Sequence, residues 1–152
     1  MQTAGLMYIV SAAGSLMVSS TLKPIVNSTI SMVSSLTSSS DSHKSLEKVL
    51  HEIDLLATIK LIEATVLAMD CSNEPIKTAS NHVVDGINKI NGILTKIADV
   101  KAAHASGYIS RWRTLDLSDE ITEIREAMEV LNKRFNLLCN INSMNNKNTH
   151  KK

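Results

Sequence analysis

Uncharged side chains dominate the first forty positions, where Lys23 is the only residue with a formal charge. Apolar side chains in residues 3–22 are interrupted only by small and hydroxyl-bearing ones, which predicts a helix. About 20 such residues suffice to cross a bilayer. Ser11, Ser15 and Ser19 recur every four residues and share one face, so we predict a small-residue stripe for close helix contact.

The pattern changes at Lys23-Pro24 and resumes over residues 25–36. Pro24 fits the first turn of a second helix, where its missing N–H costs nothing. Residues 3–36 therefore form either a helical hairpin or one kinked helix. A serine-rich linker follows, and Asp41 or a neighbouring serine is the predicted N-cap of the next helix.

Three longer amphipathic helices are predicted over residues 42–69, 75–105 and 117–141. The apolar face of the first widens after residue 60, so we expect this half to be covered on more than one side. The other two carry apolar seams with alternating spacings of three and four. These seams are Val83, Ile87, Ile90, Leu94 and Ile97, with Gly86 and Gly92 between them to permit close packing, and Ile121, Ile124, Met128, Leu131, Phe135 and Leu138.

These elements predict an all-α fold, an antiparallel four-helix bundle with a low-charge N-terminal helix and room for one short extra helix. The bundle spans residues 1–141, divided into the nearly uncharged front end, 1–40, and the three long helices, 41–141. Residues 142–152 are Asn- and Lys-rich and are predicted to be a disordered polar tail. Two prolines, five glycines and 3% aromatic residues agree with an aliphatic helical core.

The charge and cysteine content restrict the partners and the compartment. A net charge of +1 gives no reason to expect nucleic acid binding. Cys71 and Cys139 are too few for a disulfide scaffold and fit a reducing compartment. No basic residue precedes the apolar stretch, so we expect no secretory signal. The predicted location is the cytoplasm, with a peripheral membrane location as a further expectation.

Motifs for catalysis are sparse. His51-Glu52 is not followed by a second histidine at zinc-binding spacing, and no Cys-x-x-Cys occurs. There is no phosphate loop and no serine nucleophile motif. We expect a non-enzymatic protein with no catalytic residue, no metal site, no cofactor and no small-molecule substrate.

The segment Arg111-Trp112-Arg113 is the most distinctive polar cluster. A tryptophan between two cations suits a membrane interface, with the charges on lipid phosphates. It equally suits a plug at the bundle end, with the arginines paired to acids. The residues predicted to contact a membrane or a partner are Leu6, Met7, Ile9, Val10, Leu16, Met17, Val18, Arg111, Trp112 and Arg113.

This layout resembles the N-terminal helical bundles of cell-death effectors: the HeLo and HeLo-like domains of fungi, the mixed-lineage kinase domain-like bundle and the related bundles of plant immune receptors. The resemblance rests on residues 4–22, on Tyr-Ile-Ser-Arg-Trp-Arg at 108–113 and on Leu-Asn-Lys-Arg-Phe-Asn-Leu-Leu at 131–138. It implies self-association and permeabilisation of a membrane, an anionic one in our expectation, once the first helix is released. A separate regulatory protein would supply the trigger.

Two functions follow from the sequence. The first is a membrane-active bundle of the cell-death-effector type. The alternative is a non-enzymatic adaptor or scaffold that acts through helix–helix protein interactions, with the first helix in the core or at an interface. Burial of Leu6, Ile9, Val10 and Val18 distinguishes a packed first helix from one that faces a membrane or a partner.

Overall fold

The computed structural model describes residues 14–38, 43–107 and 113–149. Within these residues it contains helices and no strand, which confirms the prediction of an all-α bundle. The helices are α2 (Gly14–Ser38), α3 (Lys44–Glu52), α4 (Leu55–Leu67), α5 (Glu74–Ser106) and α6 (Ser118–Thr149).

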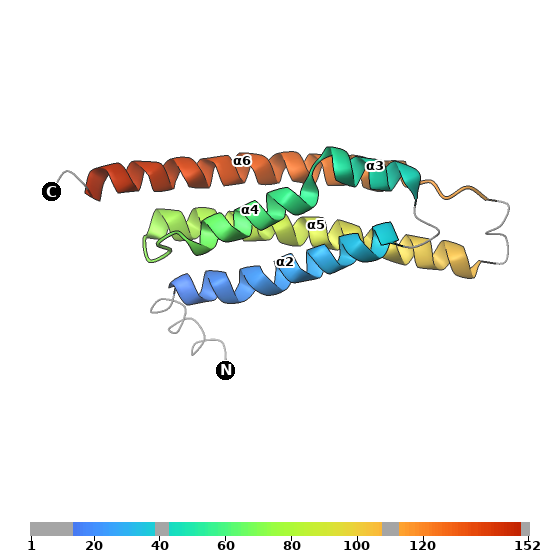
Figure 1. The fold of residues 1–152 in the computed structure, drawn as a ribbon, viewed down its shortest axis with the longest axis horizontal. Helices are drawn as coiled ribbons and strands as arrows, with labels where there is room; N and C mark the ends of the chain where they lie inside the picture. Colours follow the sequence, from blue (N-terminus) through green and yellow to red (C-terminus); the bar gives the residue numbers. More distant parts are fainter. Residues whose placement is uncertain (1–13, 39–42, 108–112, 150–152) are drawn as a thin grey trace, which may run out of the picture.

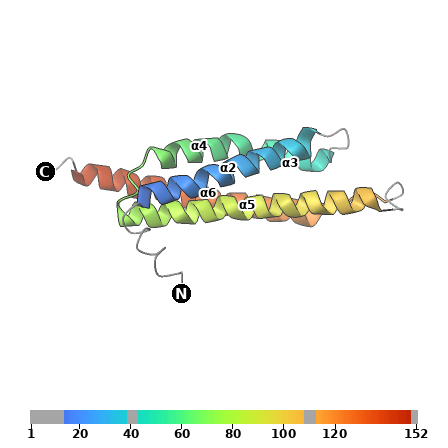
Figure 2. The ribbon, with the colours of Figure 1, turned by 90° about the horizontal axis from the view of Figure 1, so that it is seen from below.

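Successive long segments alternate in direction along the bundle. Figure 1 shows α2 and α5 running one way, while the α3–α4 segment and α6 run back. The most extensive backbone contacts are those of α5 with α6 and of α5 with α2. Helix α2 contacts both α4 and α5 (Figure 2), and buried side chains from all five described helices form one aliphatic core.

Helix α2 continues through Pro24, so the hairpin alternative is wrong for these residues. A proline inside a helix costs about 3 kcal/mol because it removes a backbone hydrogen bond. Five buried aliphatic side chains outweigh this cost, since each contributes about 1.5–3 kcal/mol. With the buried Thr29, they form a stripe that crosses the proline without a change of phase: Val18, Leu22, Val26, Thr29, Val33 and Leu36.

The predicted single helix over residues 42–69 is broken at Asp54. This residue has φ 49° and ψ 45°, in the left-handed region that Asp tolerates better than most residues. The buried Leu50 and Leu55 are five residues apart, so one uninterrupted helix would point them about 140° apart. The break lets both α3 and α4 face the core. Periodicity alone missed it because apolar residues lie on both sides of Asp54.

The N-cap of α3 is His43, not the predicted Asp41 or serine. Its Nδ1 accepts a hydrogen bond from the Leu46 N–H at 3.3 Å. Its Nε2 lies 3.0 Å from the Leu115 carbonyl, so Nε2–H donates there and joins α3 to the segment before α6. The Asp41 side chain lies outside the described residues.

We expected the second half of residues 42–69 to be covered on more than one side, and this expectation is wrong. Leu61 is 58% exposed and Leu67 is 38% exposed. The buried residues of α4 form one stripe, Leu55, Ile59, Ile62 and Val66. Helix α4 therefore lies on the outside of the bundle with one face against the core.

Helix α5 matches its prediction to within one residue at each end. Asn73 caps it by accepting a hydrogen bond from the Ile76 N–H, and all five residues of the predicted seam are buried. Gly86 permits close packing as expected, because a Cβ there would lie 3.0 Å from Leu131 Cδ1 on α6. Gly92 does not, since nothing lies within 4 Å of a Cβ built at that position.

Helix α6 begins as predicted but continues to Thr149, so a disordered tail from residue 142 is wrong as far as residue 149. In the predicted seam Ile121 and Phe135 are half-buried, and the other members are buried. The seam pattern continues into the tail at Asn142 and Asn145, which are also half-buried. Asn73 Nδ2 donates to Asn145 Oδ1 at 3.3 Å. The last turns extend past the other helices (Figure 1).

Candidate functional site

Most residues predicted to contact a membrane or a partner lie where the structure gives no side chain. Leu6, Met7, Ile9, Val10, Ser11, Arg111 and Trp112 are outside the described residues, and Ser15, Leu16 and Met17 belong to α2 without described side chains. Their predicted contacts stay predictions. The described members of the set are Val18, Ser19 and Arg113.

Val18 is 3% exposed and belongs to the core, and Ser19 is half-buried. Val18 therefore contacts a membrane or a partner only if α2 leaves the bundle. Its neighbour in the stripe, Leu22, is completely buried, so such a departure would open the core between α2 and α5.

The side chain of Arg113 is exposed, and its carbonyl accepts a hydrogen bond from His104 Nε2 at 2.7 Å. This bond fastens the segment after residue 112 to the last turn of α5. This bond does not decide whether the Arg111-Trp112-Arg113 cluster lies at a membrane interface or plugs the bundle end, because Arg111 and Trp112 are not described.

A contact made by small hydroxyl residues does join α2 to α5, at positions that the sequence analysis did not select. Asn91 Nδ2 donates to Ser28 Oγ at 3.0 Å and to Thr29 Oγ1 at 3.1 Å. Thr29 is completely buried, and its hydroxyl donates to the Ile25 carbonyl at 2.8 Å. Small side chains at this contact permit the close approach of the two helices. The sequence feature that could have indicated this contact is Thr29, a polar residue between Val26 and Val33 in the apolar stripe.

The largest exposed apolar side chains of α6 lie in one line, which we call the α6 stripe: Val130, Leu137 and Met144. They are 41%, 54% and 66% exposed. Each is seven residues, or about two helical turns, from the next, so they share one face. Sequence reasoning missed this stripe because it searched α6 for one seam and stopped the helix before Met144.

A groove of about 460 Å³ runs beside the stripe between the first turns of α5 and the second half of α6. We call it the α5–α6 groove. It is lined by Glu74, Pro75, Thr78, Ala79, His82, Arg134, Leu137 and Ile141. Arg134 Nη1 on α6 donates to the His82 carbonyl on α5 at 2.9 Å, so a hydrogen bond joins the two sides of the groove. Leu137 belongs to both the groove and the stripe.

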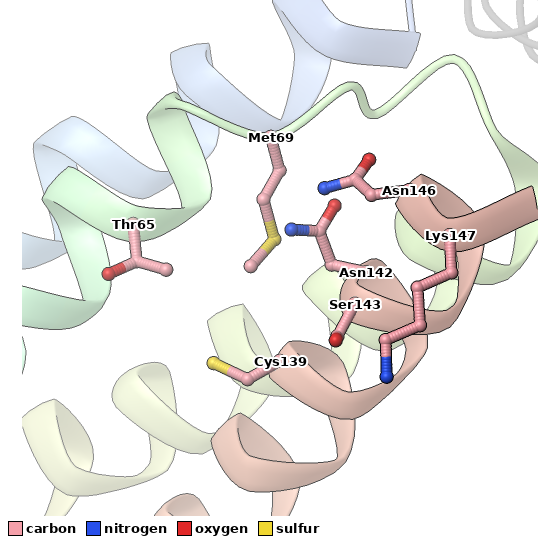
Figure 3. Close-up of a pocket in the computed structure, with 7 residues that line it drawn as sticks. All are labelled: Thr65, Met69, Cys139, Asn142, Ser143, Asn146 and Lys147. Carbon is pink, nitrogen blue, oxygen red and sulfur yellow. The ribbon is translucent and has the colours of Figure 1, made fainter. Parts of the chain in front are cut away.

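A second hollow, of about 410 Å³, separates the end of α4 from α6 (Figure 3). It is lined by Thr65, Met69, Cys139, Asn142, Ser143, Asn146 and Lys147. The Met69 side chain projects into the space between the two helices, and burial raises the pKa of the Cys139 thiol. A protonated thiol is a poor nucleophile. The lining of this hollow combines sulfur, amide, hydroxyl and ammonium groups and includes no carboxylate or imidazole.

Ion pairs tie the outer helices together at the surface. Arg125 Nη2 on α6 lies 2.9 Å from Glu52 Oε2 on α3, and this hydrogen bond lowers the pKa of the Glu52 carboxyl. Lys96 on α5 lies 3.3 Å from Glu123 and 3.8 Å from Glu120, both on α6. Exposed pairs of this kind contribute little to stability, because water and salt screen them.

Two negative observations apply to the part of the chain that the structure describes. In residues 14–38, 43–107 and 113–149, no three His, Cys, Asp or Glu side chains gather where they could hold a metal ion. Among the same residues, no helix combines the length and the apolar character that crossing a membrane requires.

Comparison of the chain with protein-family models, with curated proteins and with solved structures finds no match.

Proposed function

We propose that this protein is a non-enzymatic helical bundle that binds an amphipathic helix of a second protein molecule. The binding surface is the α5–α6 groove together with the α6 stripe. The observation that carries the proposal is the alignment of Val130, Leu137 and Met144 on one exposed face beside an apolar groove.

Exposure of these side chains has a physical cost that binding would remove. Burying a Leu, Val or Met side chain contributes about 1.5–3 kcal/mol. Exposed apolar residues scattered singly need no explanation, and Leu61 and Leu67 on α4 are of that kind. Side chains that align beside a groove are typical of a protein-binding surface.

The surroundings of the groove suit a helical ligand. Its lining combines the apolar side chains of Ala79 and Ile141 with the charged or polar groups of Glu74, His82 and Arg134. Protein interfaces combine apolar and polar groups in this way. A helix with apolar residues at three- and four-residue spacing places them along such a groove.

A titration monitored by NMR tests the proposal. The ¹⁵N-labelled chain would be mixed with a synthetic helical peptide that carries leucines at i, i+3, i+4 and i+7. We expect shift changes confined to residues of the α5–α6 groove and the α6 stripe, and at least a tenfold weaker effect for Leu137→Asp. Leu61→Asp is the matched control, because Leu61 is equally exposed on α4.

A scrambled peptide of the same composition should leave the spectrum unchanged. If the ordered peptide produces no shifts, or produces shifts that Leu61→Asp abolishes and Leu137→Asp does not, the proposal fails.

Membrane activity is the second candidate, and one observation favours it. Residues 4–22 carry no charge, and Lys23, which is exposed, is the only charged residue of α2, so release of α2 would present a long helix with a single charge to a bilayer. In this version α2 leaves the bundle, and its polar contact with α5 at Asn91 breaks.

A reversible lock tests this second candidate. Ser28 and Asn91, whose side chains meet at 3.0 Å, would both become cysteine in a background in which Cys71 and Cys139 are serine. Membrane activity predicts dye release from anionic vesicles by the reduced protein and none by the disulfide-locked form. The candidate fails if the reduced protein releases no dye from any anionic vesicle, or if the lock changes nothing.

A further inference from the structure

We infer that the helix bound at this surface is α6 of a second copy, packed antiparallel about a two-fold axis through Leu137. The inference rests on the proposed function, because it names the partner of the same surface. Three features of α6 support it: the spacing of the stripe, the distribution of charge and the free side of the helix.

The stripe matches itself when the helix is reversed. Val130 and Met144 each lie seven residues from Leu137. In an antiparallel pair centred on Leu137, Val130 of one copy faces Met144 of the other, and the two Leu137 side chains meet. A two-fold interface needs this kind of self-complementary surface. All three exposed apolar side chains of α6 would then be covered by one contact.

The charges of α6 favour the antiparallel direction. Its first half, residues 118–131, holds five acids and one arginine, whereas residues 132–149 hold three basic residues and no acid. In the register centred on Leu137 the two helices overlap over residues 125–149. Lys147 of the second copy then faces residue 127, between Glu126 and Glu129. Parallel packing would instead align like charges, which destabilises an interface.

The side of α6 that carries the stripe is open to a second helix. Cys139 and Asn142 line the hollow on the α4 side, whereas Leu137 and Ile141 line the groove beside α5. Met144 is 66% exposed in the last two turns of α6. These turns are rich in Asn, a weak helix former, so cover by a second helix would stabilise them.

Substitution at the axis gives the first test. Leu137→Lys places two ammonium groups opposite each other in every dimer, so one change acts twice. By sedimentation velocity across a concentration series, we expect the unmodified chain to form a dimer and Leu137→Lys to raise its dissociation constant at least tenfold. Leu61→Lys, with a similarly exposed leucine on α4, should change it less than twofold. Circular dichroism verifies that all three chains stay folded.

Chemical crosslinking tests the direction of the pair. Val130→Cys and Met144→Cys would be made separately in a Cys139→Ser background and treated with a short bismaleimide. An antiparallel pair predicts a covalent dimer only when the two variants are mixed. Alone, each new thiol lies 14 residues, or about 21 Å, from the matching thiol of the second copy. Dimers from either variant alone, or none from the mixture, overturn the inference.

The outcomes separate this inference from the proposed function. A chain that stays monomeric into the millimolar range, yet binds the amphipathic peptide at the groove, overturns the second copy and supports the binding surface. A dimer that Leu61→Lys disrupts and Leu137→Lys leaves intact also overturns it. A chain that neither dimerises nor binds the peptide overturns both.

Discussion

Helices α2 and α6 differ in charge and in apolar exposure, and the helix with fewer charged residues is the one that exposes fewer large apolar side chains among the described residues. Helix α2 has one charged residue, Lys23, in 25 positions, yet none of its described side chains is a large exposed apolar one. Helix α6 carries nine charged residues and exposes three large apolar side chains, those of the α6 stripe. The uncharged helix is therefore the one whose apolar residues are covered.

The reason is that a polar face does not require charge. The exposed side of α2 carries Ser and Asn residues, including Asn27, Ser31, Ser34 and Ser35. Hydroxyl groups satisfy their hydrogen bonds with water or with the helix itself, as Thr37 does by donating to the Val33 carbonyl at 2.9 Å. On α6 charged side chains occupy much of the exposed surface, and the apolar side chains of the α6 stripe are exposed beside them.

Truncation of one leucine on each helix should produce the largest contrast. Leu22 of α2 is completely buried, so Leu22→Ala should lower the free energy of unfolding by about 2–5 kcal/mol. Leu137 of α6 is 54% exposed, and Leu137→Ala should change it by less than about 0.5 kcal/mol in dilute protein. Urea unfolding followed by circular dichroism measures both. Equal losses would contradict the assignment of α2 to the core.

Loss of the polar contact on the inner side of α2 should have a smaller effect. Asn91→Ala removes the donor to Ser28 and Thr29, which should cost about 1 kcal/mol. Asn136→Ala on the exposed side of α6 is the control, because it makes the same change in helix propensity. The difference between the two urea midpoints isolates the contact. No difference would mean that the amide does not stabilise the α2–α5 packing.

The two glycines of α5 allow a comparison between a closely packed position, Gly86, and an open one, Gly92. Gly92→Ala adds a Cβ in open space and should stabilise the chain by about 0.5–1 kcal/mol. Gly86→Ala gains less or loses stability, since its Cβ would lie 3.0 Å from Leu131 Cδ1 and α6 would have to shift. Thermal unfolding of the two variants measures the difference. A larger gain at Gly86 would show that α5 and α6 pack less tightly than described.

The smallest expected effect is one of pH, and it concerns the α6 side of the bundle. Helix α2 has no acid, whereas Glu52 on α3 is bonded to Arg125 on α6. This bond lowers the pKa of Glu52 below its ordinary value of 4.5. The stabilisation is therefore fully present above that value and is lost as pH falls through the lowered pKa.

Glu52→Gln should consequently flatten the change in urea midpoint between pH 7 and about pH 3. Glu63→Gln on α4 is the control, because no ion pair is found for Glu63 among the described residues. If both variants keep the full pH dependence, the Glu52–Arg125 pair does not contribute to it.

The seams of α5 and α6 could be predicted because they are long and regular. Ile87, Ile90 and Leu94 repeat at alternating spacings of four and three, and such a pattern has one interpretation. The break at Asp54 could not be predicted. Apolar residues follow on both sides of it, and the change of phase matters only once Leu50 and Leu55 face the same core.

The candidate site was predicted less well than the fold. The small-residue contact predicted at Ser11, Ser15 and Ser19 stays a prediction, because Ser11 and the side chain of Ser15 are not described. The contact that the structure describes, at Ser28 and Thr29, was not predicted, because it depends on which turn of α5 lies opposite. The α6 stripe depended on where α6 ends, and poor helix formers after Ile141 concealed its last two turns.

By itself, the sequence determined that the chain is helical, that its core is aliphatic and which faces of α5 and α6 are buried, because these follow from periodicity within one helix. Only the tertiary structure decided that α2 passes through Pro24, that α3 and α4 separate at Asp54 and that Val130, Leu137 and Met144 remain exposed. Each of these depends on what another helix covers. A residue's neighbours along the chain fix its face of the helix, and only the packed partner fixes whether that face meets water.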